Sequence, residues 1–179
     1  MSRFLPLLFH QPDFCANPFQ HFALFRCAVH ELRAHLAARQ ANHFLKRLEA
    51  TEIADQVAVD SAGTIGYHAH NPADARMQKH ADRRGYQLVS RARKVTAADF
   101  DEFDLIVAMD RDNLADLMSR RHSGAGCELR LFCDFATKYA SVTDVPDPYY
   151  GGDDGFEHVL DLLEDGVEGL LDHVAQQLH

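Results

Sequence analysis

The chain has 179 residues, of which 46% are hydrophobic and 25% charged, and its formal net charge is −9 at pH 7. This length predicts one compact domain, and the composition excludes wholesale disorder and collagen-like repeats. The acidic balance argues against nucleic acid as a partner. No apolar run approaches the roughly 18 residues that a membrane-spanning helix needs, so we expect no membrane partner.

Residues 1–20 are predicted to form an irregular arm, because they hold three of the six prolines and show no period of 2 or 3.6. The apolar run 22–25 predicts a short strand, and helical spacing of apolar residues predicts a helix over 28–50. The alternating, β-branched segment 56–61 predicts a strand that is followed by a turn over 62–66.

The rest of the chain continues to alternate between helices and strands. Helices are predicted over 72–84, 110–121 and 156–178, and strands over 104–109 and 129–133. The apolar residues of 104–109 run without alternation, which is typical of a strand buried on both faces of a parallel sheet. Strands separated by helices predict βαβ units, whose ligands bind beyond the carboxyl ends of the strands.

Polar side chains follow three of the predicted strands at those carboxyl ends. They are Asp60, Ser61, Asp110 and Asp134. The 144–152 loop is the most informative segment, because Pro146 and Pro148 flank Asp147 and restrict the backbone on both sides of it.

A stiffly held carboxyl group with aromatic rings beside it is suited to general acid catalysis. Tyr149 and Tyr150 directly follow the Asp147–Pro148 pair and would supply those rings. The alternative is a proline-stiffened turn before a helix, with both tyrosines serving as packing.

Several motifs resemble the low-molecular-weight protein tyrosine phosphatases in order and spacing over about residues 56–175. They are DSAGT at 60–64, SRAR at 90–93, AMD at 108–110 and DPYYGG at 147–152. The resemblance implies a single three-layer α/β domain over 21–179, with a four-stranded parallel sheet flanked by helices. It also implies cofactor-free hydrolysis of phosphotyrosine proteins or small aryl phosphates by a monomer or weak dimer.

The resemblance also implies roles for single residues. The aspartate of DPYY, here Asp147, would be the general acid, and Tyr149 and Tyr150 would wall the substrate pocket. The serine of DSAGT, here Ser61, would support the phosphate-binding loop.

The family's phosphate-binding loop, C-x-G-N-x-C-R-S-P, is absent as written. One cysteine has an arginine six residues later: Cys27, with Arg33, at about the family's distance before Asp60. By position, Cys27 is the candidate nucleophile and Arg33 the candidate phosphate clamp. Residues 28–32 contain no glycine or asparagine, although such a loop needs positive φ angles. The alternative is a small apolar cysteine that enters a helix.

Two explanations fit this departure. The chain is either a degenerate member that kept the fold, or the product of a reading-frame error upstream of about residue 45. We expect a phosphatase that acts through a cysteinyl-phosphate intermediate and is impaired by its abnormal loop. The competing class is a catalytically dead phosphatase-fold protein with a binding or regulatory role.

Apart from Cys27, the cysteines of the chain predict no catalytic, disulfide or zinc-binding role. The chain holds four: Cys15, Cys27, Cys127 and Cys133. They form neither a disulfide framework nor a CxxC zinc motif, and Phe4–Phe9 is too short for a signal peptide. We therefore expect a cytoplasmic protein without a metal. Arsenate reduction on the same scaffold normally needs relay cysteines downstream of the nucleophile, and Cys127 and Cys133 lie far from that stretch.

Overall fold

The computed structural model describes residues 7–8, 21–27, 51, 53, 56–64, 70, 72, 75–86, 93–147 and 152–178. The helix expected over 28–50, including Arg33, lies outside these residues, as do Tyr149 and Tyr150. The strands are β1 (Leu7–Leu8), β2 (His21–Cys27), β3 (Val57–Gly63), β4 (Leu105–Ala108) and β5 (Glu128–Leu131). The helices are α2 (Ala75–Arg83), α3 (Asp99–Glu102), α4 (Arg111–Arg120), the 3-10 helix η3 (Phe132–Phe135) and α5 (Gly152–Leu178).

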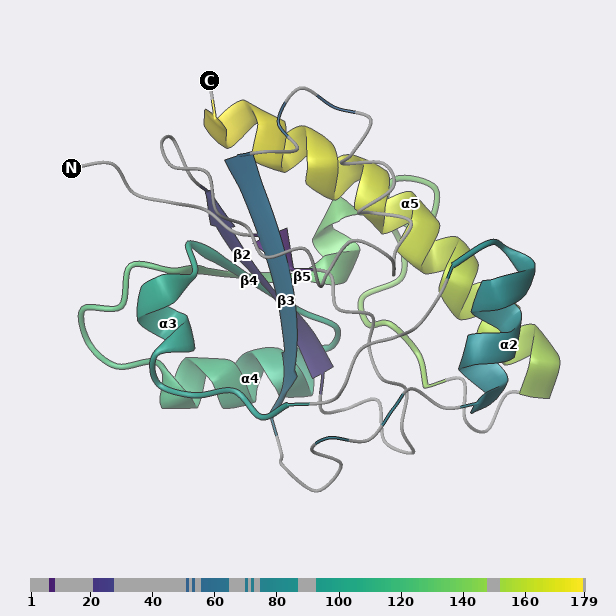
Figure 1. The fold of residues 1–179 in the computed structure, drawn as a ribbon, viewed down its shortest axis with the longest axis horizontal. Coiled ribbons are helices and arrows are strands. Elements are labelled where there is room, and N and C mark those ends of the chain that lie inside the picture. Colours follow the sequence, from purple (N-terminus) through teal and green to yellow (C-terminus); the bar gives the residue numbers. More distant parts are fainter. Residues whose placement is uncertain are drawn as a thin grey trace.

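The strands form one sheet with helices on both faces, which confirms the expected α/β class. α2 and α5 cover one face, and α3 and α4 cover the other (Figure 1). Two apolar clusters fill the spaces between these layers, one beneath α2 and α5 and one beneath α3 and α4. No helix among the described residues is both long and apolar enough to cross a bilayer.

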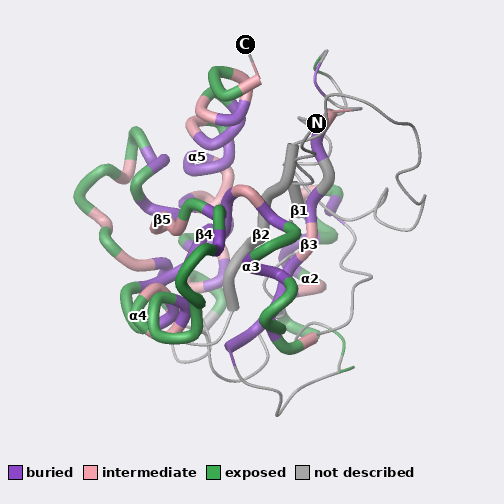
Figure 2. Tube along the Cα trace, turned by 90° about the vertical axis from the view of Figure 1, so that its left-hand side faces the viewer, coloured by how far each residue is buried: buried purple, intermediate pink, exposed green. Residues whose placement is uncertain are grey.

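β4 lies at the centre of the molecule and is buried along its whole length (Figure 2). Leu105 and Val107 point into the cluster beneath α5, whereas Ile106 and Ala108 point into the cluster beneath α4. This double burial explains why the residues after Asp104 run apolar without alternation over 105–109.

The sheet differs from the four parallel strands that the resemblance implied. It has five strands, and β2 lies between β3 and β4. β2 pairs antiparallel with β1, β3 and β4, whereas β4 and β5 pair parallel. Therefore β3, β4 and β5 run in one direction and β2 runs against them. The two residues of β1 also show that the expected irregular arm contributes a short strand.

The register shows what the reversal of β2 does. Cys27 pairs with Val57 at the start of β3, and Phe25 pairs with Leu105 at the start of β4. A short apolar strand can be buried in either direction, because reversing the strand leaves the same side chains on each face of the sheet. The 22–25 pattern therefore predicted a strand but not its direction.

Candidate active site

The carboxyl ends of β3 and β4 meet at one edge of the sheet, because the two strands run in the same direction. β3 carries Ser61 near this edge, and Asp110 follows β4. The loop that leads to Asp147 also comes here, since the Val145 N–H donates to the Met109 carbonyl oxygen at 2.8 Å. The structure thus places Ser61, Asp110 and Asp147 at the edge where βαβ sheets bind ligands.

Ser61 lies in a rigid part of this edge. Its side chain is buried, and its N–H donates to Asp60 Oδ1 at 2.9 Å. β3 is extended beyond Ser61 by a backbone ladder, in which the Gly63 N–H donates to the Arg93 carbonyl at 2.8 Å. Hydrogen bonds therefore hold the backbone on both sides of Ser61.

An arginine bridge braces the same strand end from the side. Arg93 donates from Nε to Asp60 Oδ2 at 2.6 Å, and from Nη1 and Nη2 to the two oxygens of Asp99 at 3.0 and 2.9 Å. Asp99 is buried and also accepts the Thr96 N–H at 2.6 Å. The bridge joins β3 to α3, and no period or motif in the sequence predicted this pairing.

Asp110 follows β4 and caps α4. Its carboxylate accepts the Asn113 N–H at 2.6 Å, the usual N-cap contact. Burial raises the pKa of Asp110, and the nearby charges of Asp112 and Asp144 act in the same direction. The Asn113 side chain is fully buried, and its Nδ2 and Oδ1 have no hydrogen-bond partner in the described part of the chain. This edge therefore carries polar groups that are costly to bury.

Asp147 is half-buried and lies two residues beyond the backbone contact of Val145. The turn before it is tied to the start of α4 by an ion pair between Arg111 and Asp144. The sequence predicted a stiff Asp147 from its flanking prolines, but it did not predict this second restraint.

Cys27 lies at the opposite end of the sheet. It continues two residues beyond Phe25, which faces Leu105, in the direction away from Met109. At a rise of about 3.3 Å per residue, its Cα lies about 20 Å along the strand from the point that anchors the Asp147 loop. The structure therefore does not bring Cys27 together with Asp147.

Cys133 lies at the carboxyl end of β5, at the same edge of the sheet as the Asp147 loop. It lies in η3, directly after β5, rather than in the strand expected over 129–133. Burial raises its thiol pKa to about 11, and the charges of Asp144 and Asp134 add to the effect. A neutral, buried thiol is a poor nucleophile. Within the described ranges, no group of three His, Cys, Asp or Glu side chains is arranged to bind a metal.

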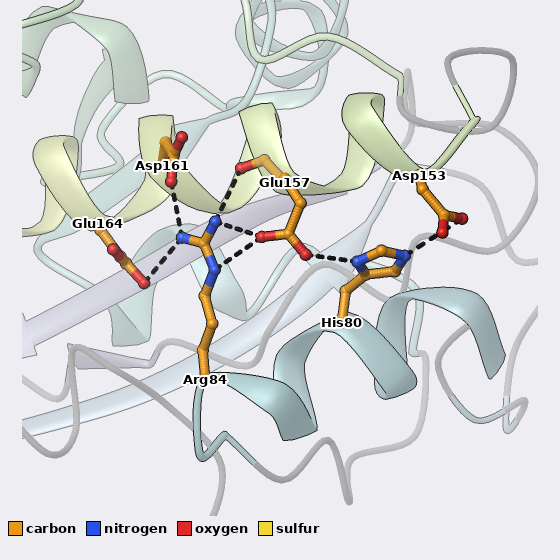
Figure 3. Close-up of polar contacts among 6 residues, drawn as sticks. All are labelled: His80, Arg84, Asp153, Glu157, Asp161 and Glu164. Carbon is orange, nitrogen blue, oxygen red and sulfur yellow. Dashed lines mark hydrogen bonds and ion pairs between the residues drawn. The ribbon is translucent and has the colours of Figure 1, made fainter.

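The start of α5, directly after the Asp147 loop, is fixed by α2 (Figure 3). His80 is buried, with Nδ1 2.5 Å from Glu157 Oε1 and Nε2 3.5 Å from Asp153 Oδ1. Arg84 Nη1 lies 2.8 Å from Asp161 Oδ1, and its Nε donates to Glu157 Oε2 at 3.0 Å. α2 follows the DSAGT segment in the chain, so these contacts join the helices that follow the two candidate site segments.

Comparison with known proteins identifies the family of the chain. The family model described as "Low molecular weight phosphotyrosine protein phosphatase" matches residues 23–179. The chain is 38% identical over 156 residues to slr0328 of Synechocystis sp., which is named for the same family, covering 87% of this chain and 97% of that one. A solved protein tyrosine phosphatase of Entamoeba histolytica superposes with a TM-score of 0.70 at 39% identity, covering 76% of this chain and 87% of that one.

Proposed function

Because the chain belongs to the low molecular weight phosphotyrosine protein phosphatase family, we propose that it binds phosphotyrosine proteins or small aryl phosphates at the carboxyl edge of β3 and β4. We further propose that it hydrolyses them poorly. The observation that carries this proposal is the reversed direction of β2, which separates Cys27 from Asp147 by most of the height of the sheet.

The proposed roles at this edge follow from chemistry. In the cysteinyl-phosphate route, Asp147 would protonate the phenolate oxygen while a thiolate bonds to phosphorus and the phosphorus–oxygen bond breaks, and it would then take a proton from the water that displaces phosphate from the sulfur. Ser61 would support the phosphate-binding backbone, and Tyr149 and Tyr150 would wall the pocket. Arg33 is proposed as the phosphate clamp only by its spacing six residues after Cys27 in the sequence.

The impaired step is nucleophilic attack. A thiolate must lie in line with the phosphorus–oxygen bond that breaks, on the side away from the general acid. Cys27 meets the spacing to Arg33 but is at the far edge, and Cys133 is held as a thiol by its pKa of about 11. Hydrolysis through a cysteinyl-phosphate intermediate therefore lacks a placed nucleophile among the described residues.

The free thiols of Cys127 and Cys133 fit a protein of the reducing cytoplasm, and we propose that it works there as a monomer or weak dimer.

Hydrolysis of 4-nitrophenyl phosphate tests the proposal, with the wild type compared with Cys27→Ser and Asp147→Ala. We expect the wild type to be slow and Cys27→Ser to have the same rate. A competent site would behave differently: Cys27→Ser would abolish turnover, and Asp147→Ala would lower kcat by about 10²–10⁴. That pattern would contradict the proposal that hydrolysis is impaired. Circular dichroism of each variant would confirm that the variant is folded.

The reversal of β2 also favours a second candidate, a binding or regulatory protein without turnover. The two candidates differ in whether bound phosphotyrosine is consumed. Thermal unfolding in phosphate measures binding alone, since an anion at 100 times its Kd stabilises the folded state by about 2.7 kcal/mol. Protection by phosphate without any release from phosphotyrosine would favour the binding protein. Slow release that Asp147→Ala diminishes would favour the impaired enzyme.

A further inference from the structure

The carboxylate of Asp144 joins the loop of Asp147 to the start of α4. The Asp144 carboxylate accepts from Arg111 Nε at 3.1 Å (Oδ1) and 3.0 Å (Oδ2), and from Nη2 at 2.7 Å (Oδ2). The backbone N–H of Arg111 donates to Asp144 Oδ1 at 2.8 Å, and the Thr143 hydroxyl donates to Oδ2 at 2.7 Å. Arg111 therefore binds the Asp144 carboxylate through both its guanidinium group and its backbone N–H. We call this the Arg111–Asp144 clasp.

The clasp is continuous with the core. The next residue, Val145, is 4% exposed and donates its N–H to Met109 at 2.8 Å. Residues 144 and 145 are therefore fixed across the junction between β4 and α4. Pro146 then restricts the backbone that leads to Asp147. Few backbone torsions therefore separate the clasp from Asp147.

Electrostatics explain why a charged pair is needed at this point. Asp110, Asp112 and Asp144 all lie near the start of α4, and their mutual repulsion would push the loop outward. The guanidinium of Arg111 offsets this repulsion, and its hydrogen bonds lower the pKa of Asp144, so this carboxyl stays charged. A lysine could supply the charge but not the two-pronged geometry.

We propose that Arg111 and Asp144 are positioning residues that set the direction in which the Asp147 carboxyl faces the substrate. This inference rests on the proposed role of Asp147 as the general acid. The clasp itself is exposed, since the Arg111 side chain is 69% exposed. Its loss should therefore leave global stability almost unchanged and act on the loop.

The test is carbon-13 NMR of the Asp147 carboxyl in the full chain without substrate, in the wild type, Arg111→Gln, Arg111→Lys and Asp144→Asn. We expect the Asp147 signal to move in Arg111→Gln and Asp144→Asn, and to move less in Arg111→Lys. Hydrogen exchange of the Val145 amide should accelerate about tenfold in Arg111→Gln, which corresponds to about 1.4 kcal/mol of local opening.

Arg120→Gln is the matched control, because Arg120 pairs with Asp116 at the other end of the same helix. An Asp147 signal that stays in place in both Arg111→Gln and Asp144→Asn would overturn the proposal, and so would an equal movement in Arg120→Gln. These signals need no turnover, so they report on the clasp even if hydrolysis is absent. Turnover that Asp147→Ala leaves unchanged would refute the proposed function instead.

Discussion

At the scale of single residues, Gly169 sets how closely α5 approaches η3. A Cβ on Gly169 would lie far inside van der Waals contact with the Phe135 carbonyl oxygen. That atom belongs to the backbone and cannot turn away. Glycine has a low helix propensity, but at this position it allows α5 to pack closely against η3.

Gly169→Ala reverses the usual effect of replacing a helical glycine. Such a change in an exposed helix gains about 1 kcal/mol, but here we expect a loss of about 2 kcal/mol because overpacking displaces η3. Urea unfolding measures the difference. Gly126→Ala is the control, since no heavy atom lies within 4 Å of its Cβ position. A Gly169→Ala protein as stable as the control variant would refute the close contact.

Asp165 holds the turn after η3. Its carboxylate is buried and accepts the N–H groups of Thr137, Lys138 and Tyr139 at 2.9, 2.9 and 3.1 Å. The Thr137 hydroxyl also donates to it at 2.9 Å. Burial would raise the pKa of Asp165, but the hydrogen bonds outweigh burial, so the pKa is lowered.

This lowered pKa makes the contribution of Asp165 depend on pH. A lowered folded pKa means that the stabilisation is complete above the unfolded value of about 3.9 and is lost as the pH falls through the folded pKa. Asp165→Asn should cost about 2 kcal/mol at pH 7 and progressively less below about pH 4. Urea unfolding of both proteins from pH 7 to pH 2.5 measures this, and a difference that stays constant would contradict it.

At the scale of elements, the contacts between α2 and α5 involve more charged groups than an ordinary surface ion pair. Arg84 is 21% exposed and lies within 3.1 Å of carboxylates from three successive turns of α5. Hydrogen bonds from His80 and then Arg84 lower the pKa of Glu157. The two helices therefore share one charge network (Figure 3).

Arg84→Ala should destabilise the protein by about 1–2 kcal/mol, because it leaves several carboxylates unpaired. The loss should shrink in 1 M salt, where the Debye length is about 3 Å. Arg120→Ala removes a simple i,i+4 pair and should cost only about 0.3–0.5 kcal/mol. Equal losses in the two variants would show that the network adds nothing to a single pair.

Periodicity predicted most helices and strands of the described residues but not their long-range pairing. The strand predicted over 104–109 is Leu105–Ala108, and the helix predicted over 110–121 is Arg111–Arg120. These elements have strong local patterns. The direction of β2 and the Arg111–Asp144 clasp depend on residues far apart in the chain, for which no local pattern exists. The spacing of Cys27 to Arg33 and Asp60 likewise predicted its place in the sequence, but it could not predict the edge of the sheet at which Cys27 lies.

At the scale of the whole molecule, two features act on the candidate site in opposite ways. β3, β4 and the loop between Thr143 and Asp147 form one polar edge, braced by two arginine bridges. β2 lies between β3 and β4 in the sheet, but it runs in the opposite direction, so its carboxyl end lies at the other edge. Cys27, which the sequence spacing predicts as the nucleophile at this edge, therefore lies at the opposite edge of the sheet.

The distance between Cys27 and residue 147 tests this account most directly. Nitroxide labels on Cys27 and on an Asp147→Cys substitution, in a Cys15→Ser background, can be measured by pulsed electron paramagnetic resonance. Cys127 and Cys133 are 1% and 6% exposed and should escape labelling. We predict a separation of about 20 Å or more, from the strand rise of about 3.3 Å per residue. Labels close enough to broaden the continuous-wave spectrum would contradict the reversed strand and restore Cys27 as the nucleophile.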